Sequence, residues 1–398
     1  MLDRQDLGED SSAGAAAHHA PPRPFSVELV STEDGLLGLK DVWTRLEEQS
    51  GDFNVFASFD WVSAWWRYIG LNDAFWGPKR LHILVLRREG KVTGLAPFMI
   101  RNETRFGFPM RKVEFIGWLS ADYNGWLFEG DSAAGGHAIL EYLSAEEKDW
   151  DLIDLKNIPE ESETLAALKK ALARSKLSHR FRPDARCPYI PIRTNWVEFL
   201  KSQSKSFRKM IRNNRSRMKS LEAEGLRVRI IEHPHEEAGL LQRMAAVEQR
   251  KLAALAKPDP VLTSSKDFFE TLLRTLGAAG RIHVALMEKP NQLIAYQLLF
   301  RCGRKLWNYT SAYDPAHSHC SPGIMLIPAI LDYAFQHQCS EYDFLSGLAP
   351  YKVRWAREFH QNTRVVIWSR RWESRLSAFL NSGIRTQAYR WLARLRAR

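Results

Sequence analysis

The residues with the clearest capacity for chemistry are Ser321, Pro322 and Gly323, which stand directly before the apolar run IMLIPAILDYAFQ. The apolar residues of that run recur at helical spacing, so the three residues mark the start of a helix. Proline is tolerated in a first helical turn, and glycine lets another molecule approach the backbone closely. Free N–H groups at a helix start bind anions. The sequence therefore predicts an anion site here, with a phosphate as the anion.

Strands on either side must hold this helix start in place. Residues 306–313 alternate β-branched and aromatic side chains as a half-buried strand does, and residues 342–345 form a second, short strand. Strand, loop, helix and strand make a βαβ crossover. Upstream, residues 282–287 and 293–300 read as a hairpin. Three antiparallel strands that lead into a crossover differ from the all-parallel order of a Rossmann fold.

This order is that of the GNAT acyltransferase core, and the sequence resembles the GNAT-like acetyltransferases of the cellulose-biosynthesis (CelD/BcsL) type, which are related in fold to FemAB-like transferases. The resemblance extends over residues 196–368. It rests on Tyr313-Asp314, Ser321-Pro322-Gly323, Tyr342-Asp343-Phe344-Leu345, Gly347, Tyr351-Lys352 and Arg354-Trp355. The pyrophosphate-loop spacing Q/R-x-x-G-x-G/A of the family is not met, and only Gly323 remains of it.

The resemblance implies an acyl-CoA N-acyltransferase fold of the α/β (α+β) class, with acetyl-CoA or another acyl-CoA as co-substrate and no metal. The donor is expected in a gap between the strand ending at Tyr313 and the strand that contains Asp343. The residues expected to bind it are Ala312, Tyr313, Ser321, Pro322, Gly323, Ile324 and Met325.

Three further residues match the family at positions that could carry catalysis. A carboxylate at Asp343 could orient the acceptor or act as a base, and a structural carboxylate is an equal alternative. Tyr351 could protonate the leaving thiolate, and Lys352 could hold an anionic group. Either of these two could instead cap the helix that starts there.

His317, His319 and Cys320 form an H-x-H-C cluster that superficially suggests a metal site. No fourth ligand stands at a recognisable spacing, so we expect no zinc. A Cys-His nucleophilic pair is a weak alternative, because neighbouring loop residues seldom point at each other. We interpret the cluster as part of a loop that lies over the donor.

The chain contains a degenerate internal repeat, because residues 81–100 and 282–300 share one pattern of apolar strand, charged turn and apolar strand. Two GNAT-like halves follow, each a mixed, largely antiparallel sheet flanked by helices. We predict a disordered segment at 1–24, an N-terminal half at 25–190 without the phosphate loop, a C-terminal acyltransferase half at 191–369, and an Arg-rich amphipathic tail at 370–398. The first half is expected to build one wall of a cleft.

Charge and composition limit the other function classes. The net charge of +11 is local, because the stretch from Lys201 to Lys219 holds eight basic residues and no acidic one. We expect no membrane span and no signal peptide, and the four cysteines lack framework spacing, so a cytoplasmic protein is predicted.

These features lead to one main functional hypothesis and two alternatives. The chain is expected to move an acyl group from acyl-CoA to an amine or hydroxyl of a small-molecule or saccharide acceptor, and the resemblance suggests polysaccharide or cell-envelope metabolism. A FemAB-like transferase would instead use charged tRNA, held by the basic stretch. A non-catalytic protein would bind an anionic membrane or nucleic acid through the Arg-rich tail.

Overall fold

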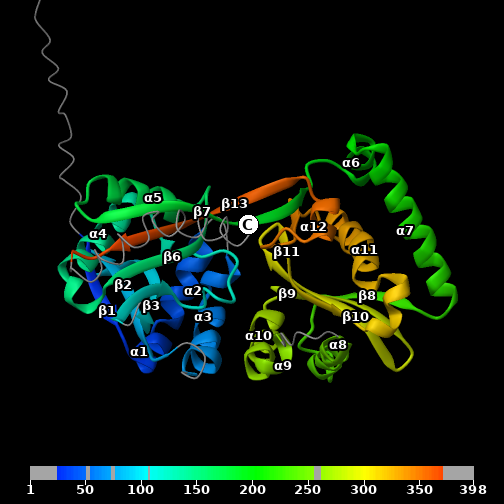
Figure 1. Ribbon diagram of the computed structural model, residues 1–398, viewed down its shortest axis with the longest axis horizontal. Helices are drawn as coiled ribbons and strands as arrows, with labels where there is room; N and C mark the ends of the chain where they lie inside the picture. Colours follow the sequence, from blue (N-terminus) through cyan, green and yellow to red (C-terminus); the bar gives the residue numbers. More distant parts are fainter. Residues whose placement is uncertain (1–24, 51–53, 73–76, 106–107, 255–260, 371–398) are drawn as a thin grey trace, which may run out of the picture.

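The computed structural model describes residues 25–50, 54–72, 77–105, 108–254 and 261–370. The predicted N-terminal segment and, beyond Arg370, the Arg-rich tail lie outside the described residues. The described strands form one 13-stranded sheet that runs through two lobes (Figure 1). This mixed, mostly antiparallel sheet flanked by helices confirms the predicted fold class. None of the helices in the described ranges is long and apolar enough to cross a membrane.

The N-terminal half contains four antiparallel strands in chain order, β1 to β4. The short strand β5 pairs with β3, and β6 lies parallel to β4. Its strands are β1 (Ser26–Val30), β2 (Lys79–Arg88), β3 (Lys91–Arg105), β4 (Phe108–Phe115), β5 (Leu127–Phe128) and β6 (Leu152–Pro159). Its helices are α1 (Glu33–Gly38), α2 (Lys40–Gln49), α3 (Phe59–Trp65), α4 (Ser132–Ala145) and α5 (Glu163–Ala173). The first two helices, α1 and α2, meet at Leu39.

The C-terminal half repeats this order, with four antiparallel strands and a fifth, β12, parallel to β11. Its strands are β8 (Arg227–Ile231), β9 (Ile282–Lys289), β10 (Gln292–Cys302), β11 (Lys305–Tyr313) and β12 (Glu341–Asp343). Its helices are α6 (Trp196–Ser202), α7 (Lys205–Ala223), α8 (Leu240–Ala254), α9 (Val261–Ser264), α10 (Lys266–Ala278), α11 (Pro322–Gln336) and α12 (Pro350–Trp355). The βαβ crossover predicted from the sequence is thus β11, α11 and β12.

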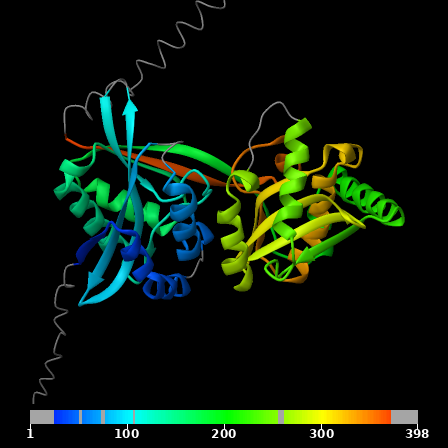
Figure 2. The ribbon, with the colours of Figure 1, turned by 90° about the horizontal axis from the view of Figure 1, so that it is seen from below.

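Two long strands, β7 (Ser178–Pro191) and β13 (Glu358–Trp368), run between the lobes (Figures 1 and 2). They pair with each other in an antiparallel register, and β13 also pairs with β6. The end of β7 pairs with β12. β13, the last strand among the described residues, therefore completes the sheet of the N-terminal half.

A partly buried group of charges attaches β13 to that half, with a half-buried arginine and a fully buried carboxylate. Arg364 donates two hydrogen bonds, of 2.5 and 2.7 Å, to the carboxylate of Asp154 on β6. Asp154 is fully buried and also pairs with Lys112 of β4 at 2.8 Å. The charges of Arg364 and Lys112 outweigh burial and hold the pKa of Asp154 below its usual value. The ion pairs therefore link three neighbouring strands.

One hydrophobic core joins the lobes. Trp61 of α3 packs edge-on against Phe268 of α10, with ring centroids 5.0 Å apart. Phe56 stacks on Trp307 of β11 at 5.6 Å. Both contacts bring side chains of the first half against the sheet and helices of the second. Burial of these large aromatic surfaces fixes the face that the two halves present to each other.

Candidate active site

The parallel strands β11 and β12 separate soon after they meet. They pair only where Lys305–Trp307 lies beside Glu341–Asp343. Beyond that point β11 stays beside β10 as far as Tyr313. The N–H groups of Phe344 and Gly347 bond instead to carbonyl groups of β7, at 2.9 and 3.2 Å. The sheet is therefore split after Trp307 and Asp343, which is the gap where the sequence placed the acyl donor.

The matching gap in the N-terminal half is filled by the chain itself. Residues 116–126, which we call the wedge loop, follow β4 directly. The N–H of Asn124 donates to the carbonyl of Asn157 at 2.7 Å, and its side chain donates to the carbonyl of Lys156 at 3.1 Å. The Asn157 amide donates back to the carbonyl of Ala121 at 2.9 Å. The loop thus closes the space between β4 and β6.

The wedge loop also contacts both sides of the split in the C-terminal half. The phenol of Tyr123 donates to the carboxylate of Asp343 at 2.5 Å. The phenol of Tyr309, on β11, donates to the carbonyl of Ser120 at 3.0 Å. Residues of the first half therefore line the site predicted for the second half, in keeping with the expected wall of a cleft.

Asp343 has the environment of a proton-exchanging group. Its side chain is fully buried, and it also accepts the N–H of Leu345 at 2.7 Å. Burial raises the pKa of Asp343 to about 7, although the Tyr123 hydrogen bond and the charge of His360 act to lower it. A carboxylate with a pKa near neutrality can both take up and release a proton under working conditions.

Two further ionisable side chains lie next to Asp343. The Nε2 atom of His360 is 3.2 Å from the carboxylate of Glu341. Burial lowers the pKa of His360, but its contact with Glu341 outweighs this and raises it. The potential ligand atoms of Glu341, Asp343 and His360 all lie within 4.8 Å of one another, so these side chains could hold a cation. The sequence reasoning missed Glu341, His360 and Tyr123.

Lys352 and Tyr351 support the chain that leaves β12. The ammonium of Lys352 donates to the carbonyls of Phe344 and Ser346, each at 2.7 Å. Burial lowers the pKa of Lys352. Tyr351 packs near Phe344, with ring centroids 6.3 Å apart, and burial raises its pKa. In this arrangement Lys352 positions the loop after Asp343. Its ammonium is bonded to backbone carbonyls, so it has a structural role here and does not face an anion.

The predicted anion site at the start of α11 offers fewer donors than an ideal helix end. Ser321 has a left-handed backbone, with φ of 51°, and its carbonyl accepts the N–H groups of both Ile324 and Met325. Pro322 has no N–H. The Gly323 N–H is therefore the remaining donor of this turn. A Cβ atom added at Gly323 would meet only Cδ1 of Tyr313, at 3.8 Å, so the space before it is open.

The other predicted donor-binding residues differ in accessibility. Ala312 and Met325 are buried, whereas Tyr313 at the end of β11 is exposed. Gly323 is tied to the sheet, because its carbonyl accepts the side-chain amide of Gln297 at 2.7 Å. The same amide group accepts from Tyr342 at 3.0 Å, so Gln297 connects the helix start with β12.

The His317, His319 and Cys320 cluster lies in a short 3-10 helix, Pro315–Cys320. Cys320 is buried, and its thiol donates to the carbonyl of His317 at 3.0 Å. Burial raises the pKa of the Cys320 thiol, which is the wrong direction for a nucleophilic thiolate. The structure therefore gives no support to a Cys-His pair.

A cavity of about 550 Å³ lies between the halves. Its walls include the wedge loop, the start of α5 and the first residues of β11 and β12. Tyr123, Trp307, Glu341 and His360 line it, so its inner end meets the surroundings of Asp343 at the split. We call it the central cavity.

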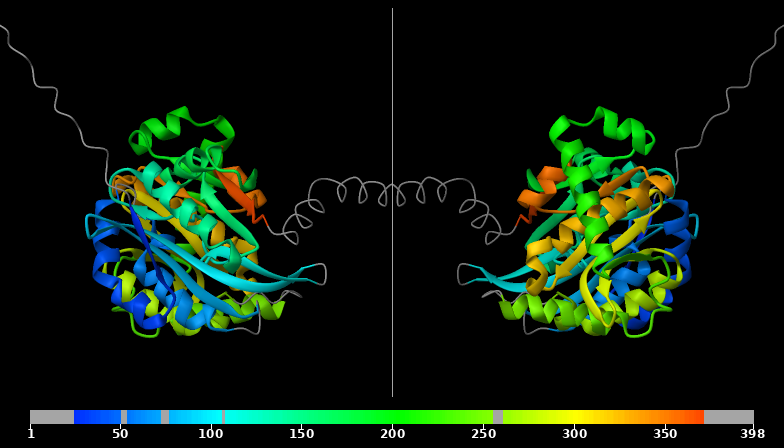
Figure 3. Two further views of the ribbon diagram at one scale, coloured as in Figure 1. Left: turned by 90° about the vertical axis from the view of Figure 1, so that its left-hand side faces the viewer. Right: turned by 90° about the vertical axis from the view of Figure 1, so that its right-hand side faces the viewer.

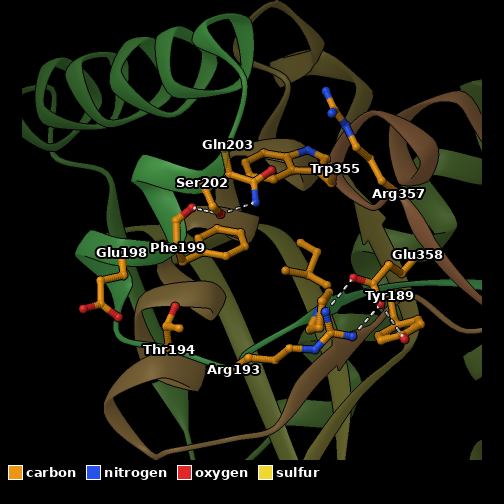
Figure 4. A pocket seen from close by; sticks show the side chains of 12 residues that line it. Tyr189, Arg193, Thr194, Glu198, Phe199, Ser202, Gln203, Trp355, Arg357 and Glu358 are labelled. Atoms are coloured by element: carbon orange, nitrogen blue, oxygen red, sulfur yellow. Dashed lines mark hydrogen bonds and ion pairs between the residues drawn. The ribbon is translucent and has the colours of Figure 1, made fainter.

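A second cavity, of about 400 Å³, is bounded by α6, the end of β7 and the junction of α12 with β13 (Figure 4). Tyr189, which lines it, stacks on His360 with ring centroids 3.9 Å apart. His360 lines the central cavity, so these two side chains separate the two hollows. Ser321 and Gly323 line neither of them.

Comparisons with known proteins agree with this geometry. Residues 205–353 match the family model described as an acetyltransferase (GNAT) domain. A search of curated proteins gave no match. Among solved structures, FemX is similar with a TM-score of 0.56 and 11% identity, over 85% of this chain and 96% of that chain.

Two other solved structures share the fold with a similar degree of structural similarity. A conserved protein of unknown function from Bacteroides thetaiotaomicron has a TM-score of 0.53 and 11% identity, over 85% of this chain and all (100%) of that one. The C-terminal domain of a putative lysylphosphatidylglycerol synthetase from Agrobacterium fabrum has a TM-score of 0.52 and 10% identity, over 88% of this chain and 96% of that one. Residues 205–353 thus match a GNAT acetyltransferase domain, which supports an N-acetyltransferase-like enzyme.

Proposed function

We propose that this enzyme transfers an acyl group from acyl-CoA to an amine, with the donor reaching the split from the start of α11 and the acceptor held in the central cavity. One observation carries the proposal. The split in the sheet begins at Asp343, and this buried carboxylate is bonded to Tyr123, which lines the cavity. A base and a substrate-sized space therefore meet where the two strands part.

The reaction needs a neutral amine and a polarised thioester. The amine nitrogen attacks the thioester carbonyl carbon, the C–S bond breaks and the CoA thiolate leaves. Asp343 takes up the proton that the amine loses, by way of the Tyr123 hydroxyl. The resemblance assigns protonation of the thiolate to Tyr351. This residue packs beside Phe344, which directly follows Asp343 at the split.

The donor is tested by calorimetric titration of CoA and acetyl-CoA into the wild type and two variants at one position. Gly323→Ala should bind CoA almost as the wild type does, because a Cβ atom there has open space. Gly323→Glu should lose at least tenfold in affinity, because a carboxylate would repel phosphate at the only free N–H of this turn. Equal CoA affinity of the two variants would place the donor elsewhere.

The proposal also includes the metabolic pathway in which the enzyme acts. The resemblance to the cellulose-biosynthesis type supports polysaccharide or cell-envelope metabolism, with a saccharide or other small molecule as the acceptor. We also infer a cytoplasmic enzyme, which the four free cysteines support.

A second candidate is a FemAB-like transferase whose donor is a charged tRNA. The observation in its favour is the outer face of α7, which stands at the edge of the C-terminal half (Figures 1 and 3). Lys205, Lys209 and Arg212 are exposed there, and within the described part of the chain no carboxylate pairs with them. Such a face suits a phosphate backbone or an anionic membrane. No residue of α7 lines either cavity.

A further inference from the structure

The outer side of α7 carries a row of positive charges. Residues three and four positions apart lie on one side of a helix, and most basic residues of α7 follow this spacing. Those on the outer side are all exposed, and we call them the basic face: Lys205, Arg208, Lys209, Arg212 and Lys219. The first acidic residue of α7 is Glu222. The helix therefore presents one sign of charge along most of its length of about 28 Å.

This arrangement of charges is unfavourable for the helix itself. Like charges three and four positions apart repel each other. Lys205 and Arg208 also lie in the first turn, where the positive end of the helix dipole disfavours cations. Exposed cations elsewhere have carboxylate partners, such as those of Arg87 at 2.9 Å and Lys91 at 2.7 Å. Within the described ranges no carboxylate pairs with the basic face, so an external anion would relieve the repulsion.

The opposite side of α7 fixes the helix to the C-terminal half. Phe207 and Leu221 are buried there, and Phe207 packs edge-on against Trp355 of α12 with ring centroids 5.8 Å apart. Arg215 pairs with Asp332 of α11. The basic face cannot turn inward without breaking these contacts. It is thus held outward at the edge of the C-terminal half (Figure 1).

Two further exposed cations extend the basic face beyond the start of α7. Arg208 donates to the carbonyl of Lys201 at 2.9 Å, so these residues adjoin. Arg357 donates to the hydroxyl of Ser204 at 3.4 Å. Lys201 and Arg357 are both exposed, and neither pairs with a carboxylate in the part of the chain that the structure describes. The positive surface is therefore broader than a single helix.

Shape and composition favour a membrane over a nucleic acid as the partner. The side of a helix is convex, and no residue of α7 lines either cavity, so the basic face offers no groove for a strand. Proteins that bind single-stranded RNA stack its bases on aromatic side chains. The one aromatic residue of α7, Phe207, is buried. A bilayer with anionic headgroups requires neither a groove nor an aromatic side chain, only nearby Lys and Arg.

We propose that the basic face docks the enzyme on an anionic phospholipid membrane. The apolar side of α7 packs on the protein core, so the helix does not insert into the bilayer, and Lys and Arg side chains contact lipid phosphate groups. Both cavities stay open in this arrangement, because α7 lines neither. Docking does not depend on acyl transfer, so the two proposals can fail separately.

Vesicle sedimentation with the full chain tests the docking. The wild type should bind vesicles of phosphatidylcholine mixed with phosphatidylglycerol at least about tenfold more tightly than vesicles of phosphatidylcholine alone. Binding should disappear when NaCl is raised from about 0.1 to about 1 M, because the Debye length falls from about 10 to about 3 Å. Equal binding to both kinds of vesicle, or no binding to the anionic ones, would overturn the inference.

A triple charge reversal locates the surface. Lys205→Glu, Lys209→Glu and Arg212→Glu together should weaken binding to anionic vesicles at least about a hundredfold, since each nearby cation contributes about fivefold. The triple variant should melt no lower than the wild type, because it removes repulsion within α7. A loss of binding therefore does not come from unfolding.

A matched control reverses three exposed cations of α5, Lys169, Lys170 and Arg174. It changes the net charge by the same amount, so its affinity for anionic vesicles should stay within about threefold of the wild type if position matters more than total charge. Equal losses in both variants, or wild-type binding by the α7 variant, would place the contact elsewhere, such as in the Arg-rich tail. Salt-sensitive tRNA binding without binding to anionic vesicles would assign the basic face to RNA instead.

Discussion

The phenol of Tyr123 donates a 2.5 Å hydrogen bond to the carboxylate of Asp343, although 220 positions in the chain separate the two residues. Tyr123 belongs to the wedge loop of the N-terminal half, and Asp343 ends strand β12 of the other half. Asp343 is the group best suited to act as a base, and its pKa is therefore adjusted by a residue of the other half.

Replacing Tyr123 with phenylalanine should shift the pH dependence of catalysis. Burial raises the pKa of Asp343 to about 7, and the Tyr123 hydrogen bond opposes that rise. Without the bond, the pKa should rise further, so the acidic limb of kcat/KM should move to higher pH. Tyr309→Phe is the control, because that phenol bonds the carbonyl of Ser120 in the same loop and not Asp343. An unchanged limb in Tyr123→Phe would exclude Asp343 as the base.

Asp343→Asn should lower kcat/KM by about 10² to 10⁴ while changing stability in a pH-dependent way. The pKa of Asp343 is raised in the fold from 3.8 to about 7, so the folded protein holds this proton more firmly than the unfolded chain. Its contribution to stability is complete below pH 3.8 and is lost as the pH rises towards 7.

Asparagine does not titrate, so the melting temperature of Asp343→Asn relative to the wild type should be higher at pH 8 than at pH 5. Differential scanning calorimetry at the two pH values measures this difference. A constant offset would show that Asp343 does not change its protonation on unfolding.

Removing Arg364 should loosen the last strand of the chain. Arg364→Ala leaves Asp154 with Lys112 as its remaining partner, so we expect a loss of about 2 kcal/mol in unfolding free energy, below the range for a buried charge left without any partner. Urea denaturation measures it. Arg87→Ala breaks an exposed pair with Glu28 and should cost less than about 1 kcal/mol. Similar losses in both variants would mean that the Arg364–Asp154 pair does not hold β13.

Charge reversal on α7 tests the tRNA alternative. Arg208 and Arg215 are unsuitable targets, because Arg208 caps the end of α6 and Arg215 pairs with Asp332 and stacks on Trp196. Changing Lys205, Lys209 and Arg212 to Glu removes free charges instead.

If α7 follows an RNA backbone, this triple variant should lower the salt slope of tRNA affinity by about 0.7 to 0.9 per contact, or about 2 to 3 in total. The control reverses three exposed cations of the other half, Lys169, Lys170 and Arg174. We expect no salt-dependent tRNA binding by the wild type and unchanged CoA affinity in both variants. Micromolar, salt-sensitive tRNA binding without CoA binding would favour the alternative.

The local elements around the site could be predicted from the sequence. The apolar periodicity after Pro322 indicated α11, and the alternating run from 306 to 313 indicated β11, because both patterns depend on residues close together in the chain. Asp343 was identified through the family resemblance, and the structure places it at the split of the sheet.

The partners of Asp343 could not be found in this way. Tyr123 and His360 reach it from a loop and a strand that tertiary packing brings to β12, and no local spacing encodes such contacts. One signal was available: the first half lacks the Ser-Pro-Gly helix start, so the loop in its place had to have another role. The carbonyl groups that accept hydrogen bonds from Lys352 could not be predicted either, because every residue has a backbone carbonyl and the sequence does not indicate which ones a side chain reaches.

The position of β13 constrains how the protein can be made. This strand lies between β6 and β7, yet it is the last element described and leaves the ribosome long after both. Until residues 358–368 emerge, the nascent N-terminal half exposes two unpaired strand edges, which are the usual starting points of aggregation. A gene divided between the two halves would encode a first product that lacks a central strand. Synthesis as one polypeptide is thus part of how this enzyme reaches its native state.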